Sequence, residues 1–236
     1  MPVTVRTFAT SGEAAAALSS ERDARYLGGG TLVMRALNEG DVAVSTIVRA
    51  TDHALTRLDV AGSRITIGAG VTFARVLAER ELGFLHPVAA SIGGPAVRNM
   101  GTIGGNLFAP APFGDFTVAL LALDATVALQ GSYGAREVGL EEFLATRARQ
   151  AAGLVLSVSL QRPASPEAFR YRKIARIKPK GAERALEGRA LDAASIAAAA
   201  AAATEGTTPI DDSLASAWYR REVAGVHLRR LLAGEP

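Results

Sequence analysis

The chain has 236 residues, 49% of them hydrophobic, which suffices for one large domain or two modest ones with their own cores. Its 26 Lys and Arg residues against 23 Asp and Glu leave a net charge of +3, too small and too scattered to indicate nucleic-acid binding. There is no cysteine, which excludes disulfides, a thiol nucleophile and cysteine-ligated iron–sulfur clusters in this sequence. The three histidines lie far apart without a metal-binding spacing, so we expect no metal site.

The two segments that could direct the chain to a membrane have the wrong composition for it. The first eleven residues lack the basic region and apolar run of a signal peptide. The alanine-rich run at residues 193–203 is too short to span a bilayer. We therefore expect a soluble, cytoplasmic protein without a membrane span.

The first fifty residues predict a small α/β unit with parallel strands. Strands are expected at residues 3–8, 24–27 and 42–48, and helices at residues 11–20 and 32–38. The second strand runs directly into Gly28, Gly29 and Gly30.

The next part of the chain predicts an α+β unit with an antiparallel sheet, because short alternating strands are joined by glycine-containing turns. Strands are expected at residues 58–60, 64–68, 126–130, 137–140, 154–160 and 169–174, and helices at residues 72–81 and 116–123. The first two strands are expected to form one hairpin, and the strands at 126–130 and 137–140 a second. Residues 91–106 are rich in glycine and show no clear periodicity.

The end of the chain predicts helices without a sheet. Residues 191–204 have high helix propensity. Residues 213–232 are amphipathic, and the apolar face is expected to carry Leu214, Trp218, Val223, Val226 and Leu231. Residues 176–182 are expected to be an exposed connector. The basic residues between positions 170 and 180 fit a solvated strand edge or loop as well as a functional surface.

Two glycine-rich segments are the candidates for the site: the first glycine segment, residues 28–31, and the second glycine segment, residues 101–106. Adjacent glycines permit positive φ and let backbone N–H groups converge on a phosphate. In the first segment Thr31 adds a hydroxyl, and the following helix adds its N-terminus. Taken alone, each segment is explained equally well by a tight turn. Two such segments in one chain suggest a ligand with two phosphates held between two lobes. Neither segment matches a Walker loop or a GxGxxG fingerprint.

Recognisable motifs surround both segments. YLGGGT at residues 26–31 and IGGPAVRNMGTIGGN at residues 92–106 resemble the two flavin loops of the FAD-binding subunits of the xanthine dehydrogenase and carbon monoxide dehydrogenase family. Asp115 and residues 119–125, 169–173 and 217–222 continue the resemblance, which covers nearly the whole chain.

This resemblance implies an α+β fold, with a two-lobed FAD-binding domain of the p-cresol methylhydroxylase type and a small, shortened C-terminal helical domain. The FAD-binding domain is expected at residues 1–175, its lobes at about 1–53 and 54–175. A domain of the CO dehydrogenase flavoprotein C-terminal type is expected at residues 176–236. Two departures stand out: Leu32 replaces a usual polar residue, and the strand-rich segment that normally precedes the terminal helices is missing. Either the domain has lost its sheet, or the sequence omits a stretch after Gly181.

The resemblance also implies which residues contact FAD, while it implies no catalytic residue and no metal ligand. Asp115 is expected to bond ribityl or ribose hydroxyls, to cap the following helix, or both. Tyr171 and Lys173 are expected either near the isoalloxazine or as exposed strand residues. The full set is Leu27, Gly28, Gly29, Gly30, Thr31, Asn99, Gly101, Thr102, Ile103, Gly104, Gly105, Asn106, Asp115, Tyr171 and Lys173.

The function implied by the resemblance is electron transfer. FAD on this chain would take electrons from 2Fe–2S clusters on a small partner subunit, after a molybdopterin-binding large subunit has oxidised the substrate, and would pass them to an external acceptor. The absence of cysteine agrees with clusters on another chain. The alternatives are a stand-alone flavin reductase on the same fold and a non-catalytic flavin-binding scaffold.

Overall fold

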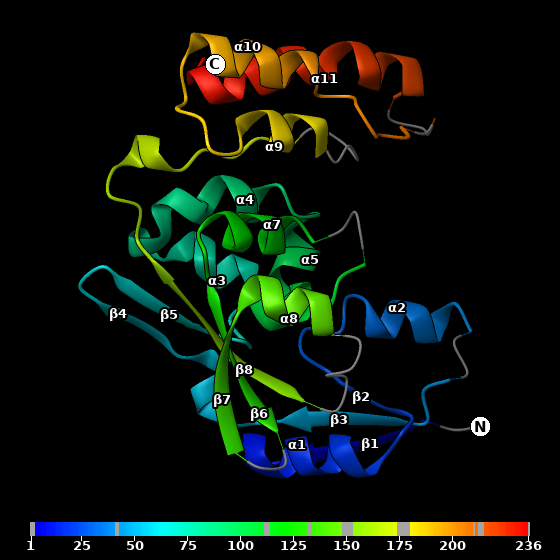
Figure 1. Ribbon diagram of the computed structural model, residues 1–236. Helices are drawn as coiled ribbons and strands as arrows, with labels where there is room; N and C mark the ends of the chain where they lie inside the picture. Colours follow the sequence, from blue (N-terminus) through cyan, green and yellow to red (C-terminus); the bar gives the residue numbers. More distant parts are fainter. Residues whose placement is uncertain are drawn as a thin grey trace. The chain divides into compact units, whose positions relative to one another are not determined.

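The computed structural model describes residues 3–40, 43–110, 114–131, 134–147, 153–173, 180–209, 211 and 215–235. The chain divides into two compact units, Met1–Ala164 and Ser165–Pro236 (Figure 1). The first unit contains both sheets, and the second is helical in its described part. The predicted α+β fold class, a two-lobed domain followed by a small helical domain, is confirmed.

The first sheet is parallel, as the sequence predicts. Its strands stand in the order β1-β3-β2, so the last strand in sequence lies in the centre. The chain enters through β1 (Thr4–Phe8), α1 (Ser11–Ser20), β2 (Ala24–Tyr26), α2 (Val33–Asn38) and β3 (Thr46–Ala50). Because all three strands run in the same direction, the loops that follow β2 and β3 both leave from the carboxyl-terminal end of the sheet.

The second sheet is antiparallel, and both predicted hairpins are confirmed. The strand order is β4-β5-β8-β6-β7. Its strands are β4 (Leu58–Ala61), β5 (Arg64–Gly68), β6 (Thr126–Gly131), β7 (Gly134–Gly139) and β8 (Leu154–Gln161).

Short helices carry the chain between these strands, and α3, α4, α5 and α7 lie together on one side of the antiparallel sheet (Figure 1). The segment around residues 91–106, which shows no periodicity in sequence, forms two helices of six and four residues, α5 and α6. The elements are η1 (His53–Thr56), α3 (Phe73–Ala78), η2 (Arg80–Leu85), α4 (His86–Ala90), α5 (Pro95–Met100), α6 (Ile103–Asn106), α7 (Asp115–Ala122) and α8 (Leu140–Thr146).

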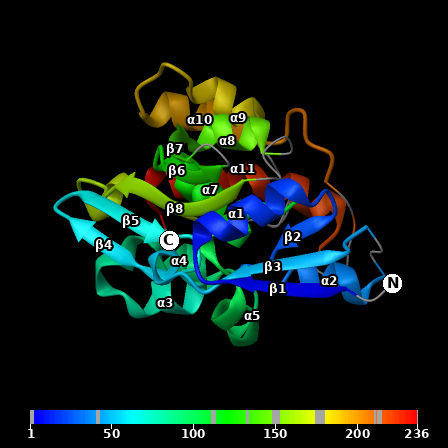
Figure 2. The same cartoon turned by 90° about the horizontal axis from the view of Figure 1, so that it is seen from below.

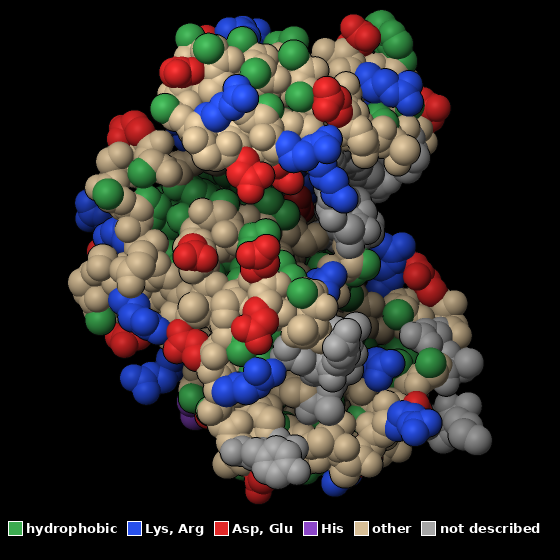
Figure 3. Space-filling model, viewed as in Figure 1, with side chains coloured by type: hydrophobic (Ala, Val, Ile, Leu, Met, Phe, Trp, Pro, Cys, Tyr) green, Lys and Arg blue, Asp and Glu red, His purple; other side chains and the backbone are tan. Residues whose placement is uncertain are grey.

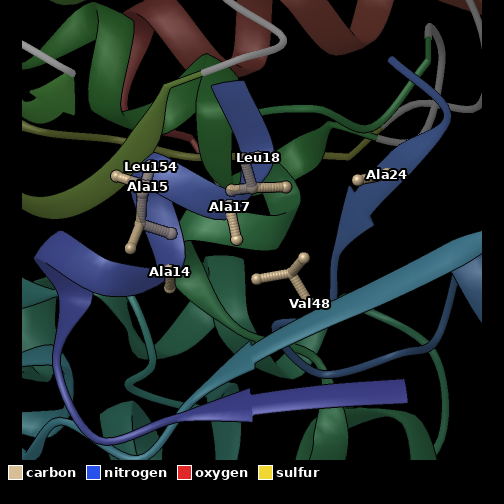
Figure 4. Close-up of a cluster of buried hydrophobic side chains, with 7 residues drawn as sticks. All are labelled: Ala14, Ala15, Ala17, Leu18, Ala24, Val48 and Leu154. Carbon is tan, nitrogen blue, oxygen red and sulfur yellow. The ribbon is translucent and has the colours of Figure 1, made fainter. Parts of the chain in front are cut away.

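Helix α1 joins the two sheets into one core. Viewed from below, it lies over strands of both (Figure 2). Its buried Ala14, Ala15, Ala17 and Leu18 pack against side chains of β2, β3 and β8, including Val48 and Leu154 (Figure 4). The small alanine side chains let α1 pack closely against both sheets. The two sheets, whose strands precede the glycine segments, therefore share one core.

In the second unit, small residues bring three helices together: α9 (Lys180–Leu186), α10 (Ala193–Ala201) and α11 (Ala217–Ala233). A Cβ added at Gly181 would lie 2.5 Å from the Ala202 carbonyl oxygen, and one at Gly225 would lie 2.6 Å from that of Ala200. Both glycines therefore permit close backbone approach to α10. The described residues of this unit include a short 3₁₀ turn, η3 (Pro166–Ala168), and no strand, in agreement with a C-terminal domain that lacks a sheet.

Three expectations for this part of the chain are wrong. Residues 169–173 form no strand, and Ile174 lies outside the described residues. Residues 176–179 of the expected connector also lie outside, but Lys180 begins α9, where Gly181 and Ala182 are buried. On α11, Trp218 and Val226 are 67% and 46% exposed, and the residues that the helix buries are Arg220 and Ala224.

The described helices include none long and apolar enough to cross a membrane. On the face drawn in Figure 3, basic and acidic side chains are interspersed over the surface.

Candidate functional site

The candidate site lies at the carboxyl ends of β2 and β3. In open parallel sheets this edge is where ligands bind, because the loops there can diverge around a crevice. A pocket of about 190 Å³ opens at this position within the first unit. It is lined by Tyr26, Leu27, Gly28, Arg49, Ala50, Thr51, Asp52, His53, Leu55, Thr56, Gly70 and Thr102.

The first glycine segment offers uncommitted hydrogen-bond donors. Among the described residues, the backbone N–H groups of Gly28, Gly29 and Gly30 donate no hydrogen bond. Gly30 has a φ of +76°, which only glycine adopts readily. Helix α2, which follows, has six residues and no side-chain cap, so the donors of the segment are its amides and the Thr31 hydroxyl rather than a long helix dipole.

The two glycine segments meet. A Cβ added at Gly28 would lie 2.9 Å from Thr102 Oγ1. One added at Gly29 would overlap the Met100 carbonyl oxygen and lie 2.9 Å from the Gly101 Cα. Glycine is required at position 29 because the backbone of the second loop occupies the space of a side chain. The structure thus brings together residues about seventy positions apart that the sequence could only suggest as partners.

The second glycine segment is not a cluster of free amides, which corrects the expectation drawn from its adjacent glycines. The amide of Gly104 donates to the Ala69 carbonyl at 2.8 Å, and that of Gly105 donates to Thr102 Oγ1 at 3.1 Å. None of its glycines has a positive φ. A Cβ at Gly104 would lie 2.7 Å from that of Ala69, so this glycine serves packing against the loop after β5. Thr102 is the residue of this segment that lines the pocket.

Asn106 is committed to the fold. Its side chain is buried, and Oδ1 accepts hydrogen bonds from the Thr117 amide at 2.9 Å and from the Thr117 hydroxyl at 3.1 Å. These bonds satisfy donors at the first turn of α7. Asp115 is the first residue of that helix and Gly114 is its N-cap, so the expectation that Asp115 is the N-cap is wrong.

The remaining residues named from the sequence have different environments. Asn99 is exposed on α5, whereas Ile103 is fully buried on α6. Tyr171 and Lys173 belong to the second unit, where Tyr171 is half-buried and Lys173 is exposed. Lys173 borders a separate pocket of about 330 Å³ in that unit. That pocket is lined by Arg172, Lys173, Ala215, Tyr219, Arg220, Val223 and His227.

Three charged or titratable residues of the first pocket lie outside the glycine motifs: Arg49, Asp52 and His53. Their position at and just after the end of β3 is the one signal that could have found them. Asp52 accepts hydrogen bonds from the amides of Ala54 at 2.9 Å and Ser11 at 3.0 Å, which hold the pKa of its carboxyl below the ordinary value. Burial raises the pKa of the Tyr26 phenol.

The pocket suits a phosphate-bearing ligand. It is lined by Gly28, whose amide donates no hydrogen bond among the described residues, by Arg49 and by Thr102, whose hydroxyl accepts from Gly105 and can still donate to an anionic oxygen. The hydroxyls of Thr51 and Thr56 already donate to the carbonyls of Phe8 and His53. The one acid in its wall, Asp52, is already held by two amides. Within the described part of the chain, no group of three or more His, Asp and Glu residues is placed to hold a metal ion.

Comparison with known families agrees with this chemistry. Residues 3–162 match the FAD binding domain in molybdopterin dehydrogenase, and residues 174–234 match the CO dehydrogenase flavoprotein C-terminal domain. The chain therefore belongs to the family of FAD-binding domains of molybdopterin dehydrogenases, as the resemblance of its glycine motifs indicates.

Particular relatives are subunits of dehydrogenases. The chain is 32% identical over 134 residues to the nicotinate dehydrogenase FAD-subunit of Eubacterium barkeri, covering 52% of this chain and 45% of the relative. It is 26% identical over 251 residues to the carbon monoxide dehydrogenase medium chain of Afipia carboxidovorans, covering 88% and 87%. The first of these matches spans less than half of the relative's length. The second alignment has 251 positions, more than the 236 residues of this chain, so it contains gaps in this chain.

Solved structures share the fold. Carbon monoxide dehydrogenase from Hydrogenophaga pseudoflava superimposes with a TM-score of 0.81 at 20% identity, covering 99% of this chain and 96% of that one. Quinoline 2-oxidoreductase from Pseudomonas putida 86 gives a TM-score of 0.76 at 23% identity, covering 99% and 96%.

Proposed function

We propose that this chain is the electron-transfer flavoprotein subunit of a molybdenum hydroxylase complex, with FAD held where the two glycine segments meet. The observation that carries the proposal is that meeting point. There the free amides of residues 28–30 stand next to Thr102, with no room for a side chain at position 29. Such a site can hold a diphosphate close to the backbone, because donors are available and no side chain stands in the way.

The proposed contacts follow from the motifs and their surroundings. Leu27, Gly28, Gly29, Gly30 and Thr31 take one side of the diphosphate. Asp115 is assigned to the ribityl or ribose hydroxyls, and Tyr171 and Lys173 to the isoalloxazine. The other side of the diphosphate is assigned to the second loop, namely Asn99, Gly101, Thr102, Ile103, Gly104, Gly105 and Asn106.

Within the second loop, the contribution of each residue differs. Thr102 lines the pocket and is available for direct contact. Gly104 and Asn106 support the ligand indirectly, since their polar groups bond within the protein. We retain 1–175 as the proposed extent of the FAD-binding domain and 176–236 as that of the C-terminal domain.

FAD, when bound, supplies the redox chemistry, and the chain binds it, orients it and shields it from solvent. With no cysteine in this sequence, iron–sulfur clusters have to come from a partner. The names of relatives, which include "medium subunit" and "FAD-subunit", support an assembly with an iron–sulfur small subunit and a molybdopterin-binding large subunit. The cytoplasm is the proposed location.

The test is an anaerobic comparison of the isolated chain with the complex purified through a tag on this chain. The probes are xanthine, nicotinate, glyceraldehyde and carbon monoxide, which the names of relatives indicate. We expect the complex to contain molybdenum, iron and FAD, and one probe to bleach its flavin while leaving the flavin of the isolated chain oxidised. Bleaching of the isolated chain would favour a stand-alone reductase. A complex whose flavin no donor reduces, dithionite included, would favour a scaffold.

A further inference from the structure

Arg49 places an uncommitted positive charge in the pocket. It is the fourth residue of β3, the central strand of the parallel sheet. Its neighbour Val48 is fully buried against α1, and because successive side chains of a strand point to opposite faces, Arg49 projects to the other side. There it is exposed and lines the pocket beside Gly28.

Among the described residues, the charge of Arg49 acts on the Tyr26 phenol, whose pKa it lowers against the larger effect of burial, but it pairs with no acid. The ion pairs and side-chain hydrogen bonds among the described residues do not include Arg49. Asp52 is the acid in the same wall, but its two carboxylate oxygens accept from the amides of Ser11 and Ala54. Arg49 therefore forms no ion pair and no side-chain hydrogen bond among the described residues, and it lies near the carboxyl end of the central strand.

The backbone amides of residues 28–30 can donate hydrogen bonds to a diphosphate, but they carry no net charge. A diphosphate bridge brings two negative charges, and its binding in a partly enclosed pocket improves when a cation offsets them. Arginine suits this task because its planar guanidinium presents several N–H donors to phosphate oxygens at once.

We propose that Arg49 is the basic residue that pairs with the diphosphate of FAD, opposite the amides of the first glycine segment. The inference rests on the proposed function, since it concerns the same ligand. It adds a binding residue outside both glycine motifs, contributed by the interior of a strand.

The test is equilibrium binding to the full-length chain after removal of its flavin, with FAD and riboflavin as the two probes. The variants are Arg49→Gln, Arg49→Lys and the control Arg57→Gln. Arg57 is exposed in the same unit and does not line the pocket. We expect Arg49→Gln to raise the Kd for FAD about 10- to 100-fold. Arg49→Lys should have a smaller effect, because lysine keeps the positive charge but lacks the planar guanidinium with its several N–H donors. Arg57→Gln should bind like the wild type.

Riboflavin separates charge pairing from damage to the fold, because it has no phosphate. Its Kd should be the same in wild type and Arg49→Gln, and the difference in FAD affinity between the two should shrink as salt is added. The proposal is overturned if Arg49→Gln binds FAD like the wild type, if it loses riboflavin to the same extent, or if Arg57→Gln is equally weakened. Failure of the wild type to bind FAD would instead refute the proposed function.

Discussion

Replacing Gly29 by alanine tests whether the contact between the two glycine segments builds the site. The added Cβ would overlap the Met100 carbonyl oxygen, lie 2.5 Å from the carbonyl carbon and 2.9 Å from the Gly101 Cα. Restoring ordinary contact with these atoms requires the loops to separate by more than about 1 Å, because the overlap is greatest at the Met100 carbonyl oxygen. The neighbours are backbone atoms, so no side-chain rotation can relieve the overlap.

The cost follows from what holds the second loop. The Gly101 carbonyl accepts from the Phe73 amide at 3.1 Å, and the Ile103 amide donates to the Val71 carbonyl at 2.9 Å. Straining these bonds while accommodating the methyl group should destabilise the unit by about 2 to 3 kcal/mol. For a unit of this size that corresponds to a fall in Tm of roughly 5 to 10 °C. The affinity for FAD should fall by at least about tenfold, because the donors no longer converge.

The assay combines thermal unfolding with measurement of bound flavin, and Gly83→Ala is the matched control. A Cβ at Gly83 has no heavy atom within 4 Å, and its φ is not positive, so this variant should keep the wild-type Tm and flavin content. If Gly29→Ala also unfolds at the wild-type temperature with full flavin, the close approach of the loops is not a requirement of the site and the reasoning fails.

Two further substitutions examine the support of the pocket. Asn106→Ala should destabilise the protein by about 1 to 3 kcal/mol in chemical denaturation, because it leaves the buried Thr117 amide without its acceptor; an unchanged midpoint would show that water or another group replaces it. Asp52→Asn should lower stability at neutral pH, because hydrogen bonds from Ser11 and Ala54 favour the carboxylate and depress its pKa. A depressed pKa gives stability above the unfolded-state value that is lost as pH falls through the folded-state value, so the gap between wild type and variant should close in acid. A gap that persists there would contradict this origin.

The sequence predicts the sheets well because each depends on local signals. Alternating apolar residues and glycine turns identify both hairpins, and the helix between β1 and β2 identifies the parallel unit. Helix α9 is missed because its Lys-Gly start resembles a connector, whereas the glycine allows close packing on α10. The apolar face expected for α11 is wrong because the helix buries Arg220 and Ala224, whereas Trp218 stays exposed.

The sequence predicts the candidate site only in part. The glycine motifs indicate both loops, but the two loops contribute differently, and that difference depends on hydrogen-bond partners far away in sequence. Gly104 is paired with Ala69, whereas Gly28 keeps its amide free among the described residues. Arg49 lies within a strand and outside every recognisable motif. That it lines the pocket becomes clear only when the fold places the carboxyl end of β3 beside the first glycine segment.

The identity and amount of the nucleotide bound to this chain test the proposed FAD site most directly. Acid release from the purified complex, followed by chromatography against FAD, FMN and ADP standards, measures both. We predict FAD at about one molecule per chain, because the single junction of the two glycine segments provides one place for a diphosphate. FMN in place of FAD, or an intact complex without flavin, would contradict the assignment of this junction as the dinucleotide site.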